Sequence, residues 1–551
     1  MKKYNLLFIT VDELWFTPEY INDELREWSR KNLKAFEYLR KKSIVFNQHR
    51  AGSTACAPSR ATIHTGQYPS LHGVSQTDGA AKSAFDPDMY WLDKSTVPTW
   101  GDYLEAAGYS TYYKGKWHIT DADIIIPGTN NSVLSYDSEG LPDPVFTQKY
   151  LSANRLKEYG FEDWVGPEPH GQNPRNSGAS AAEGLSGRDI IYGEEVVRLL
   201  KSLPEDKPWA VVSSFVNPHD ITLYGEASKN LSTFKFEIDP TLPPIPPAPT
   251  ANEDLSGKPT CQANYKKVYQ EAFQPTLDTE EYRKLYFTLQ KKVDQEVFRV
   301  LKALRKSKFR DNTIVIFTSD HGDYLGSHGL FQKWYSAYEE AIHVPFMVYV
   351  PEIEHQEIDL LTSHVDIVPT ILGLLGLNEK ELQEKIRPRY TECRPLVGRD
   401  LSPVILGTGQ LEDQPQYFMT DDNVTKGLNQ QTFTGQTYQA VTQPNSLETV
   451  IVRIDGQLYK YSQYFNNPQF AGDPSKGAPT KEQILEALTT PREYEMYNLT
   501  SDPYETRNLA KGRRRGIEKI LRRLLREQRK QKRLYPINVL QPYLPNFPPG
   551  S

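Results

Sequence analysis

The chain has 551 residues, more than one simple core needs, and this length predicts one large domain with a smaller one. Its composition, 38% hydrophobic and 24% charged, is typical of a globular protein, and the net charge of −6 implies no polyanion as a general partner. No run of about 18 apolar residues occurs, so we expect no membrane-spanning helix. We therefore expect neither a nucleic-acid nor a membrane partner.

The N-terminus reads MKKYNLLFITVDE. Two lysines before an apolar stretch suggest a signal peptide, but the stretch is short, lacks a small-residue cleavage site and runs into Asp12 and Glu13. We interpret it as the first strand of the fold. Cys56, Cys261 and Cys393 are scattered and odd in number, which argues against a disulfide framework. These features together predict a cytoplasmic protein.

Three apolar runs rich in β-branched residues each end at polar or charged residues. These runs are residues 6–11, 210–216 and 313–318. Helical patterns lie between them, at residues 99–107 and 190–203. Continuous apolar strands that alternate with helices predict an α/β fold with a large, mostly parallel mixed sheet between layers of helices. Because ligands bind beyond the carboxyl ends of such strands, the reactive residue types that follow the runs predict an active site there.

The pattern of predicted secondary structure changes at about residue 405. Asp455-Gly456, flanked by residues 451–454 and 457–465, predicts a β-hairpin. Apolar residues recur at helical spacing from Ile517 to Leu525 among many arginines and lysines, which predicts a helix docked by one apolar face with a solvated basic back. We therefore predict a smaller α+β subdomain with an antiparallel sheet, a helix and an extended tail. The predicted bounds of the two domains are 1–404 and 405–551.

Cys56 begins the string CAPSRATIHTG, which ends at Gly66. A cysteine before Pro-Ser-Arg alone would fit a buried thiol at a helix start. The full string resembles the signature of the type I sulfatases, C-x-P-S-R followed by T-G. In that family a maturation enzyme converts the cysteine to formylglycine. The resemblance implies that Cys56 is the precursor of the nucleophile and that a formylglycine-generating enzyme is a partner.

Further motifs extend the resemblance over nearly the whole chain in the family's order. Asp12 stands where the family has a metal ligand. The other matches are Gly115-Lys116-Trp117-His118, Pro218-His219, Ser319-Asp320-His321-Gly322, Lys333 and the segments 364–377 and 495–510. The implied fold is that of the alkaline-phosphatase superfamily. Arylsulfatases, choline-sulfatase-like enzymes and phosphonate monoester hydrolases are the groups it resembles.

The resemblance implies one divalent metal ion. Asp12, Asp320 and His321 are candidate ligands from two strand ends, with residue 56 beside them. Glu13 stands where most sulfatases have a second aspartate, and it either reaches the metal or faces elsewhere. Oxygen-dominated ligation favours Ca²⁺, with Mg²⁺ or Mn²⁺ as alternatives.

A sulfate monoester is an anion, and breaking its S–O bond loads charge onto the leaving oxygen and the sulfuryl group. Arg60, Lys116 and Lys333 are candidates to hold the sulfate oxygens, and His219 is the candidate general acid. His118 has another task by resemblance. One hydroxyl of hydrated formylglycine attacks sulfur, and His118 deprotonates the other, so that sulfate leaves and the aldehyde is restored.

We therefore predict hydrolysis of small-molecule sulfate esters to an alcohol or phenol and inorganic sulfate. One alternative is a phosphonate monoester or phosphodiester hydrolase, because Asp320-His321 replaces the commoner Asp-Asn pair, as in phosphonate monoester hydrolases. A second is a silent binding protein that keeps Cys56 unmodified. The segment from Gly166 to Asp189, with His170 in it, forms either a pocket wall or a surface insertion. A homo-oligomer is compatible with the sequence, which does not determine the oligomeric state.

Overall fold

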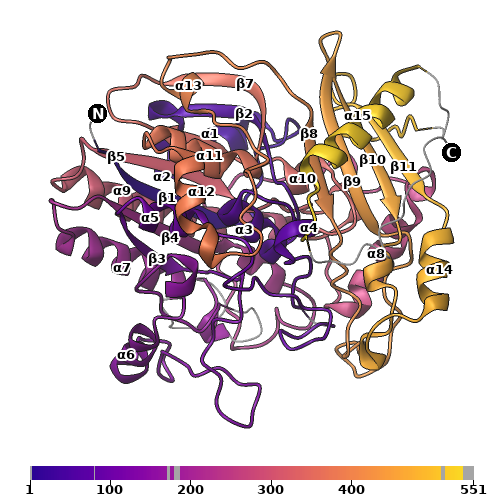
Figure 1. Cartoon of the computed structure of the whole chain (residues 1–551). Coiled ribbons are helices and arrows are strands. Elements are labelled where there is room, and N and C mark those ends of the chain that lie inside the picture. The colour runs from indigo at the N-terminus through magenta and orange to yellow at the C-terminus, as the bar shows by residue number, and fades with distance from the viewer. Residues whose placement is uncertain (1–2, 80, 170–173, 179–186, 511–515, 538–551) are drawn as a thin grey trace.

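Figure 1 shows the computed structural model of the chain, which describes residues 3–79, 81–169, 174–178, 187–510 and 516–537. His170 and the part of the predicted tail beyond residue 537 lie outside the described residues. Within these ranges no helix combines the length and the apolar character that crossing a membrane requires.

A seven-stranded sheet forms the larger part of the molecule, in the order β3-β4-β1-β5-β6-β2-β7. Its strands are β1 Asn5–Asp12, β2 Ile44–Arg50, β3 Ser110–Gly115, β4 Trp209–Pro218, β5 Thr313–Ser319, β6 Phe346–Tyr349 and β7 Gln356–Ser363. Only β6 runs antiparallel to its neighbours among these pairings. Every residue of β1, β4 and β5 is buried, as expected for strands covered on both faces. The predicted mostly parallel mixed sheet is confirmed.

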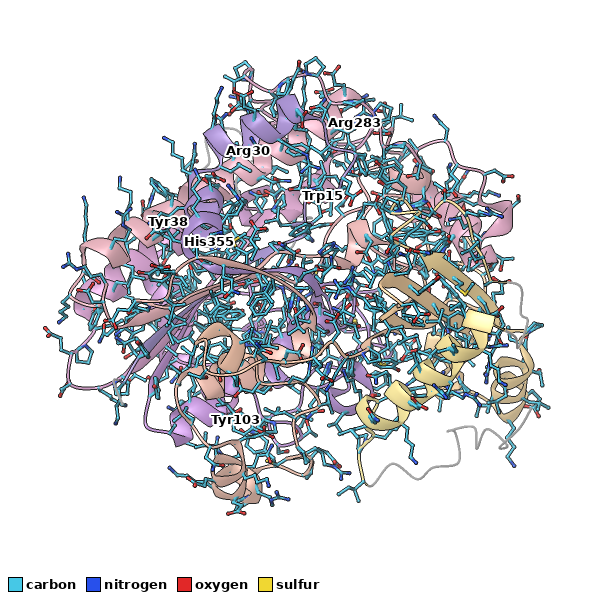
Figure 2. The ribbon with its side chains drawn as sticks, turned by 90° about the horizontal axis from the view of Figure 1, so that it is seen from above. Trp15, Arg30, Tyr38, Tyr103, Arg283 and His355 are labelled. Carbon is cyan, nitrogen blue, oxygen red and sulfur yellow. The ribbon has the colours of Figure 1, made fainter. Side chains whose placement is uncertain are left out.

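Helices cover both faces of this sheet. Alternate residues of β1 face opposite layers: Leu7 packs with α2, α7 and α9, whereas Phe8 packs with α3, α5, α11 and α12. Figure 2 shows Tyr38 of α2 and Tyr103 of α5 on opposite sides of the sheet. The helices of the chain are α1 Asp23–Asn32, α2 Lys34–Lys42, α3 Cys56–Thr65, α4 Pro69–His72, α5 Trp100–Ala106, α6 Pro144–Ala153, α7 Arg188–Ser202, α8 Thr260–Ala272, α9 Glu280–Lys306, α10 Glu339–Ile342, α11 Ile367–Leu374, α12 Glu379–Ile386, α13 Ser402–Ile405, α14 Lys481–Thr489 and α15 Gly516–Lys532.

A separate four-stranded antiparallel sheet, in the order β11-β10-β9-β8, lies beside the large sheet (Figure 1). Its strands are β8 Gln416–Thr420, β9 Ser446–Ile454, β10 Gln457–Phe465 and β11 Glu493–Asn498. The predicted hairpin is confirmed: Asp455 and Gly456 have φ values of 50° and 75°, which a type I′ turn requires. The domain boundary at residues 404 and 405 stays a prediction.

The C-terminal helix α15 docks on this sheet through Leu521 and Leu525, which are buried. The apolar face is narrower than predicted, because Ile520 is 37% exposed. The prediction of a solvated basic back was wrong at Arg529, which reaches Glu448 on β9 with Nε 2.6 Å from Oε2. A buried carboxylate needs a counter-charge, and the helix supplies it.

We expect Glu448→Gln to weaken the docking of α15 on the sheet and so to lower the free energy of unfolding. Burial alone would raise the pKa of Glu448, but Arg529 and Arg533 beside it lower the pKa to about 2. A depressed carboxyl pKa contributes stability that is complete above the ordinary value of 4.5 and is lost as the pH falls toward about 2. Breaking such a buried ion pair costs about 3–5 kcal/mol of unfolding free energy.

Thermal unfolding followed by circular dichroism measures this effect. The melting temperature of Glu448→Gln should lie well below that of the unaltered chain at pH 7, and the difference should shrink between about pH 4.5 and pH 2. Glu384→Gln, at an exposed position in α12, is the matched control. Equal melting temperatures for Glu448→Gln and Glu384→Gln at pH 7 would contradict the prediction.

Candidate active site and metal centre

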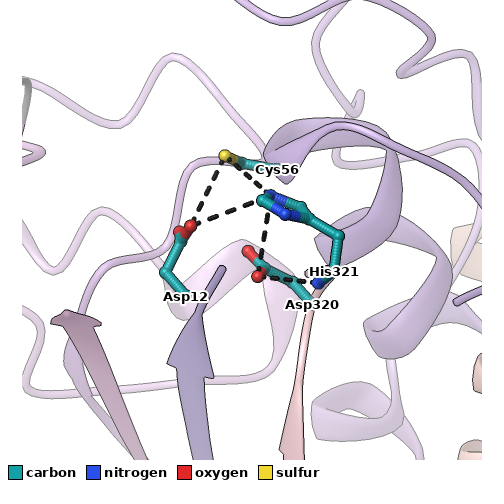
Figure 3. A group of neighbouring side chains, drawn as sticks. All are labelled: Asp12, Cys56, Asp320 and His321. Atoms are coloured by element: carbon teal, nitrogen blue, oxygen red, sulfur yellow. Dashed lines mark hydrogen bonds and ion pairs between the residues drawn. The ribbon is translucent and has the colours of Figure 1, made fainter. Parts of the chain in front are cut away.

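The carboxyl ends of three adjacent strands bring the predicted site residues together. In the sheet register Asp12 of β1 pairs with Pro218 of β4, and Val11 pairs with Ser319 of β5. His219 follows β4 directly, and Asp320 follows β5. The helix α3, which begins at Cys56, approaches the same edge of the sheet (Figure 3).

Four buried side chains converge there: Asp12, Cys56, Asp320 and His321. The Sγ atom of Cys56 lies 3.2 Å from His321 Nε2 and 3.7 Å from Asp12 Oδ1. His321 Nε2 lies 3.8 Å from Asp12 Oδ1 and 3.7 Å from Asp320 Oδ1. Two carboxylate oxygens and an imidazole nitrogen, all within 4.8 Å of one another and of Sγ, can hold a divalent metal ion.

Arg60 binds the outer oxygens of the two carboxylates. Its Nε donates to Asp320 Oδ2 at 2.8 Å and its Nη2 donates to Asp12 Oδ2 at 2.9 Å. Its Nη1 donates to Lys116 O and to Ser214 Oγ, both at 2.9 Å. Burial opposes the charge of Arg60, but Asp320 and Asp12 hold its pKa above the ordinary value. Arg60 thus orients both carboxylates through Oδ2, as residues that hydrogen-bond metal ligands do. Oδ1 of Asp320 also accepts the backbone N–H groups of Glu13 at 3.1 Å and of His321 at 2.9 Å.

Glu13 lies beside this cluster and pairs with a lysine. It has φ of 70°, and its Oε2 accepts a hydrogen bond from Lys333 Nζ at 3.0 Å. Burial and the neighbouring carboxyl of Asp323 raise the pKa of Glu13 well above its ordinary value, although Lys333 acts in the opposite direction. Asp12, Glu13 and His219 do form a second possible metal group, but the ammonium of Lys333 there opposes another cation. This arrangement favours Glu13 as the charge partner of Lys333; ligation by Glu13 stays a prediction.

Two lysines line the side of the cluster that Glu13 faces. Lys116 Nζ lies 2.7 Å from Asp12 Oδ2, and both Lys116 and Lys333 are buried. Burial opposes their charge, yet Asp12 raises the pKa of Lys116, and Cys56 and Glu13 raise that of Lys333, so both remain ammonium groups. Each ammonium has three N–H donors, so a bound anion can take those that the carboxylates leave.

His219 is the more open of the two candidate histidines, with its side chain 15% exposed. It begins the short helix His219–Leu223, and its Nε2 lies 3.9 Å from Glu13 Oε2. Burial and the nearby charge of Lys116 hold the pKa of His219 well below its ordinary value. An anion bound next to Lys116 would act in the opposite direction and favour a protonated ring.

His118 pairs with a carboxylate outside the cluster: its Nε2 lies 2.6 Å from Asp78 Oδ1. Burial opposes protonation of His118, but Asp78 and Cys56 raise its pKa above the ordinary value. Its backbone N–H donates to Glu168 Oε1 at 2.8 Å. Trp117 next to it is fully buried and packs in the core.

Three carboxylates of the site have no counterpart in the sequence motifs: Asp78, Glu168 and Asp323. Asp323 could have been suspected, because it stands three residues after Asp320 in the string SDHGD. Asp78 and Glu168 lie in loops without a recognisable pattern. Their roles follow from where those loops fold, which local sequence does not reveal.

A mostly parallel α/β fold that brings a thiol, two carboxylates and cations together at its strand ends is suited to the hydrolysis of an anionic ester. The chain belongs to the sulfatase family: the family model described as Sulfatase matches residues 4–377. It is thus a sulfuric ester hydrolase with an alkaline-phosphatase-like fold.

The chain is 27% identical over 392 residues to the uncharacterized sulfatase YidJ of Escherichia coli (strain K12), covering 69% of this chain and 70% of that protein. It is 27% identical over 426 residues to the choline-sulfatase of Rhizobium meliloti (strain 1021), covering 74% and 73%. The crystal structure of the phosphonate monoester hydrolase of Agrobacterium radiobacter has the same fold, with a TM-score of 0.58, 19% identity and 96% of each chain covered.

Proposed function

We propose that the chain hydrolyses small-molecule sulfate esters to an alcohol or phenol and inorganic sulfate, with a formylglycine made from Cys56 as nucleophile. The observation that supports this most is the position of Cys56, whose Sγ lies 3.2 Å from His321 Nε2 inside a group of candidate metal ligands. A structural thiol would not need two carboxylates and an imidazole around it. The proposal requires a formylglycine-generating enzyme as the maturation partner.

Asp12, Asp320 and His321, together with the modified residue 56, would hold one divalent ion. The donor set fits, because Arg60 binds Oδ2 of each carboxylate, while Oδ1 of Asp12 and Oδ1 of Asp320 lie 3.8 Å and 3.7 Å from His321 Nε2. Mostly oxygen donors favour Ca²⁺ over softer ions, with Mg²⁺ and Mn²⁺ as alternatives. The ion would make the hydroxyl at residue 56 a stronger nucleophile and offset negative charge on the ester.

The remaining residues bind the ester and move protons. Lys116 and Lys333 donate to its non-bridging oxygens, which carry the negative charge. His219, at the open side of the site, donates a proton to the leaving oxygen. His118, whose ring interacts with Cys56, accepts a proton from the hydroxyl that remains at residue 56 when sulfate departs.

The same cations would also accept phosphonate monoesters and phosphodiesters, because all three kinds of substrate are singly charged tetrahedral esters. The Asp320-His321 pair, shared in the sequence pattern with phosphonate monoester hydrolases, is the specific reason to keep this alternative. Lys116 and His118 in Gly-Lys-Trp-His favour the sulfate ester.

Parallel kinetics would test the proposal. The chain is co-expressed with a formylglycine-generating enzyme, and kcat/KM is measured for 4-nitrophenyl sulfate, bis(4-nitrophenyl) phosphate and 4-nitrophenyl phenylphosphonate. We expect the sulfate ester to be preferred, and a large preference for the phosphonate would establish the alternative instead. Mass spectrometry of the tryptic peptide from Ala51 to Arg60 measures the fraction of modified Cys56. A fully unmodified thiol in protein from the native source would overturn both readings.

A further inference from the structure

Carboxylates hold His118 by both its ring and its backbone. The ring nitrogen Nε2 lies 2.6 Å from Asp78 Oδ1, and the backbone N–H donates to Glu168 Oε1 at 2.8 Å. The other oxygen of Glu168 accepts the N–H of Trp117 at 3.2 Å. His118 has φ of 56°, an unfavourable value for a residue with a side chain, and such a conformation persists where the surroundings hold it. Asp78 and Glu168 therefore hold the ring and the backbone of His118 in place.

The backbone next to Asp78 is linked to the backbone next to Cys56 through one shared carboxylate. The N–H of Thr77 donates to Asp422 Oδ1 at 3.1 Å, and the N–H of Ala55, directly before Cys56, donates to Asp422 Oδ2 at 3.3 Å. One carboxylate, just beyond β8 of the second sheet, thus joins the loop of Asp78 to the start of α3. This bridge fixes the position of the Asp78 loop relative to residue 56.

An ionised carboxylate only accepts hydrogen bonds, so in this pair the hydrogen lies on His118 Nε2, and in the neutral ring Nδ1 is then the acceptor. The side chains of His118 and Asp78 are 6% and 13% exposed, so water screens their interaction little. Cys56 interacts with the same ring. With Nε2 hydrogen-bonded to Asp78, Nδ1 is the ring nitrogen that can accept a further proton.

We propose that Asp78 is a positioning residue that fixes the ring of His118 with Nδ1 toward residue 56. The inference rests on the proposed function, in which His118 accepts a proton from a hydroxyl at residue 56. In that step the O–H bond breaks and Nδ1 gains the proton. The O–H electron pair becomes the aldehyde C=O bond, while the C–O bond to sulfate breaks and its electrons leave with sulfate. Asp78 would then face an imidazolium, as the carboxylate of a Ser-His-Asp triad does.

Rapid-mixing and steady-state kinetics with 4-nitrophenyl sulfate test this assignment on the matured chain. Asp78→Asn should lower the steady-state rate by at least about 100-fold, the usual range for loss of a general base. The first molecule of 4-nitrophenol per modified site should still be released rapidly, because His118 acts after that release. Asp78→Glu should recover part of the rate. Asp206→Asn, the same change at an exposed carboxylate, should leave both phases unchanged.

Two outcomes would overturn the assignment. One is an equal loss in the first release and in later turnovers for Asp78→Asn, as a general distortion of the site would give. The other is a double variant, Asp78→Asn with His118→Ala, that is slower than His118→Ala alone by the full effect of Asp78→Asn, because residues that act through each other are not additive.

A spectroscopic measurement keeps this inference separable from the proposed function. In protein labelled with ¹⁵N-histidine, the His118 signals are assigned by their loss in His118→Ala. The unaltered chain should show the tautomer with hydrogen on Nε2, and Asp78→Asn should redistribute it. An unchanged tautomer would overturn the positioning role even in an active sulfatase. The expected change without any sulfatase activity would instead place the failure on the proposed function.

Discussion

Replacing Cys56 by alanine is expected to lower kcat for 4-nitrophenyl sulfate by at least about 10⁴-fold, because it removes the precursor of the proposed nucleophile. Cys56→Ser should behave differently. Its hydroxyl can displace the phenol, but a serine sulfate ester cannot expel sulfate as an aldehyde hydrate can. We therefore expect at most one molecule of 4-nitrophenol per chain, followed by no further turnover.

Stopped-flow measurement of phenol release distinguishes the two variants. Cys393→Ala, at a buried cysteine of the large domain that is not among the site residues, is the matched control and should keep the kcat of the unaltered chain. Sustained turnover by Cys56→Ala would show that the thiol position is not the source of the nucleophile. Sustained turnover by Cys56→Ser would show that residue 56 need not be an aldehyde.

Asp12→Asn is expected to empty the metal centre. Asp12 Oδ1 faces His321 and Cys56, while Oδ2 binds Lys116 Nζ at 2.7 Å and Arg60 Nη2 at 2.9 Å. An amide of the same shape is a weaker ligand and no longer neutralises the two cations, so repulsion replaces attraction around the ion. Loss of the ion removes several kcal/mol of transition-state stabilisation, which corresponds to a fall of about 10³-fold or more in kcat/KM.

Metal content after dialysis, measured by inductively coupled plasma mass spectrometry, is the primary readout. The unaltered chain should retain one divalent ion, and Asp12→Asn should retain much less than one. Chelation of the unaltered chain with EDTA, followed by return of Ca²⁺, Mn²⁺ or Mg²⁺, gives the same test without a substitution. Full activity after exhaustive chelation would exclude a metal-dependent reaction, and the ion that restores activity identifies the metal.

Much of the site could be predicted because the motifs lie where strands end. Asp12 and Asp320 each follow a continuous apolar run, and parallel strands that are neighbours bring their carboxyl ends to one edge of the sheet. Cys56 at the start of α3 could be added from the length of its motif. The same reasoning could not give the contacts of Arg60 with Asp12 and Asp320, and its expected role in binding sulfate stays a prediction.

The roles of buried charges depended on partners far away in the chain. Glu13 was a candidate ligand, but its pairing with Lys333 spans 320 positions in sequence. The basic face of α15 was expected to be solvated, yet Arg529 neutralises Glu448 on β9. No local sequence pattern predicts such ion-pair partners. A buried charge is stabilised by the opposite charge that the fold places beside it, and that charge can come from anywhere in the chain.

The order of apolar runs, helices and reactive residues along the chain was enough by itself to determine the α/β class, the edge of the sheet that carries the site and the residue types available there. Those properties follow from local periodicity and from the geometry of parallel strands. Only the tertiary structure decided which carboxylates face the candidate metal cluster, which one pairs with Lys333 and which one hydrogen-bonds the ring of His118. These contacts form between loops that are distant in sequence. Their strength depends on distances of a few ångströms, because the interaction between two charges weakens as they separate.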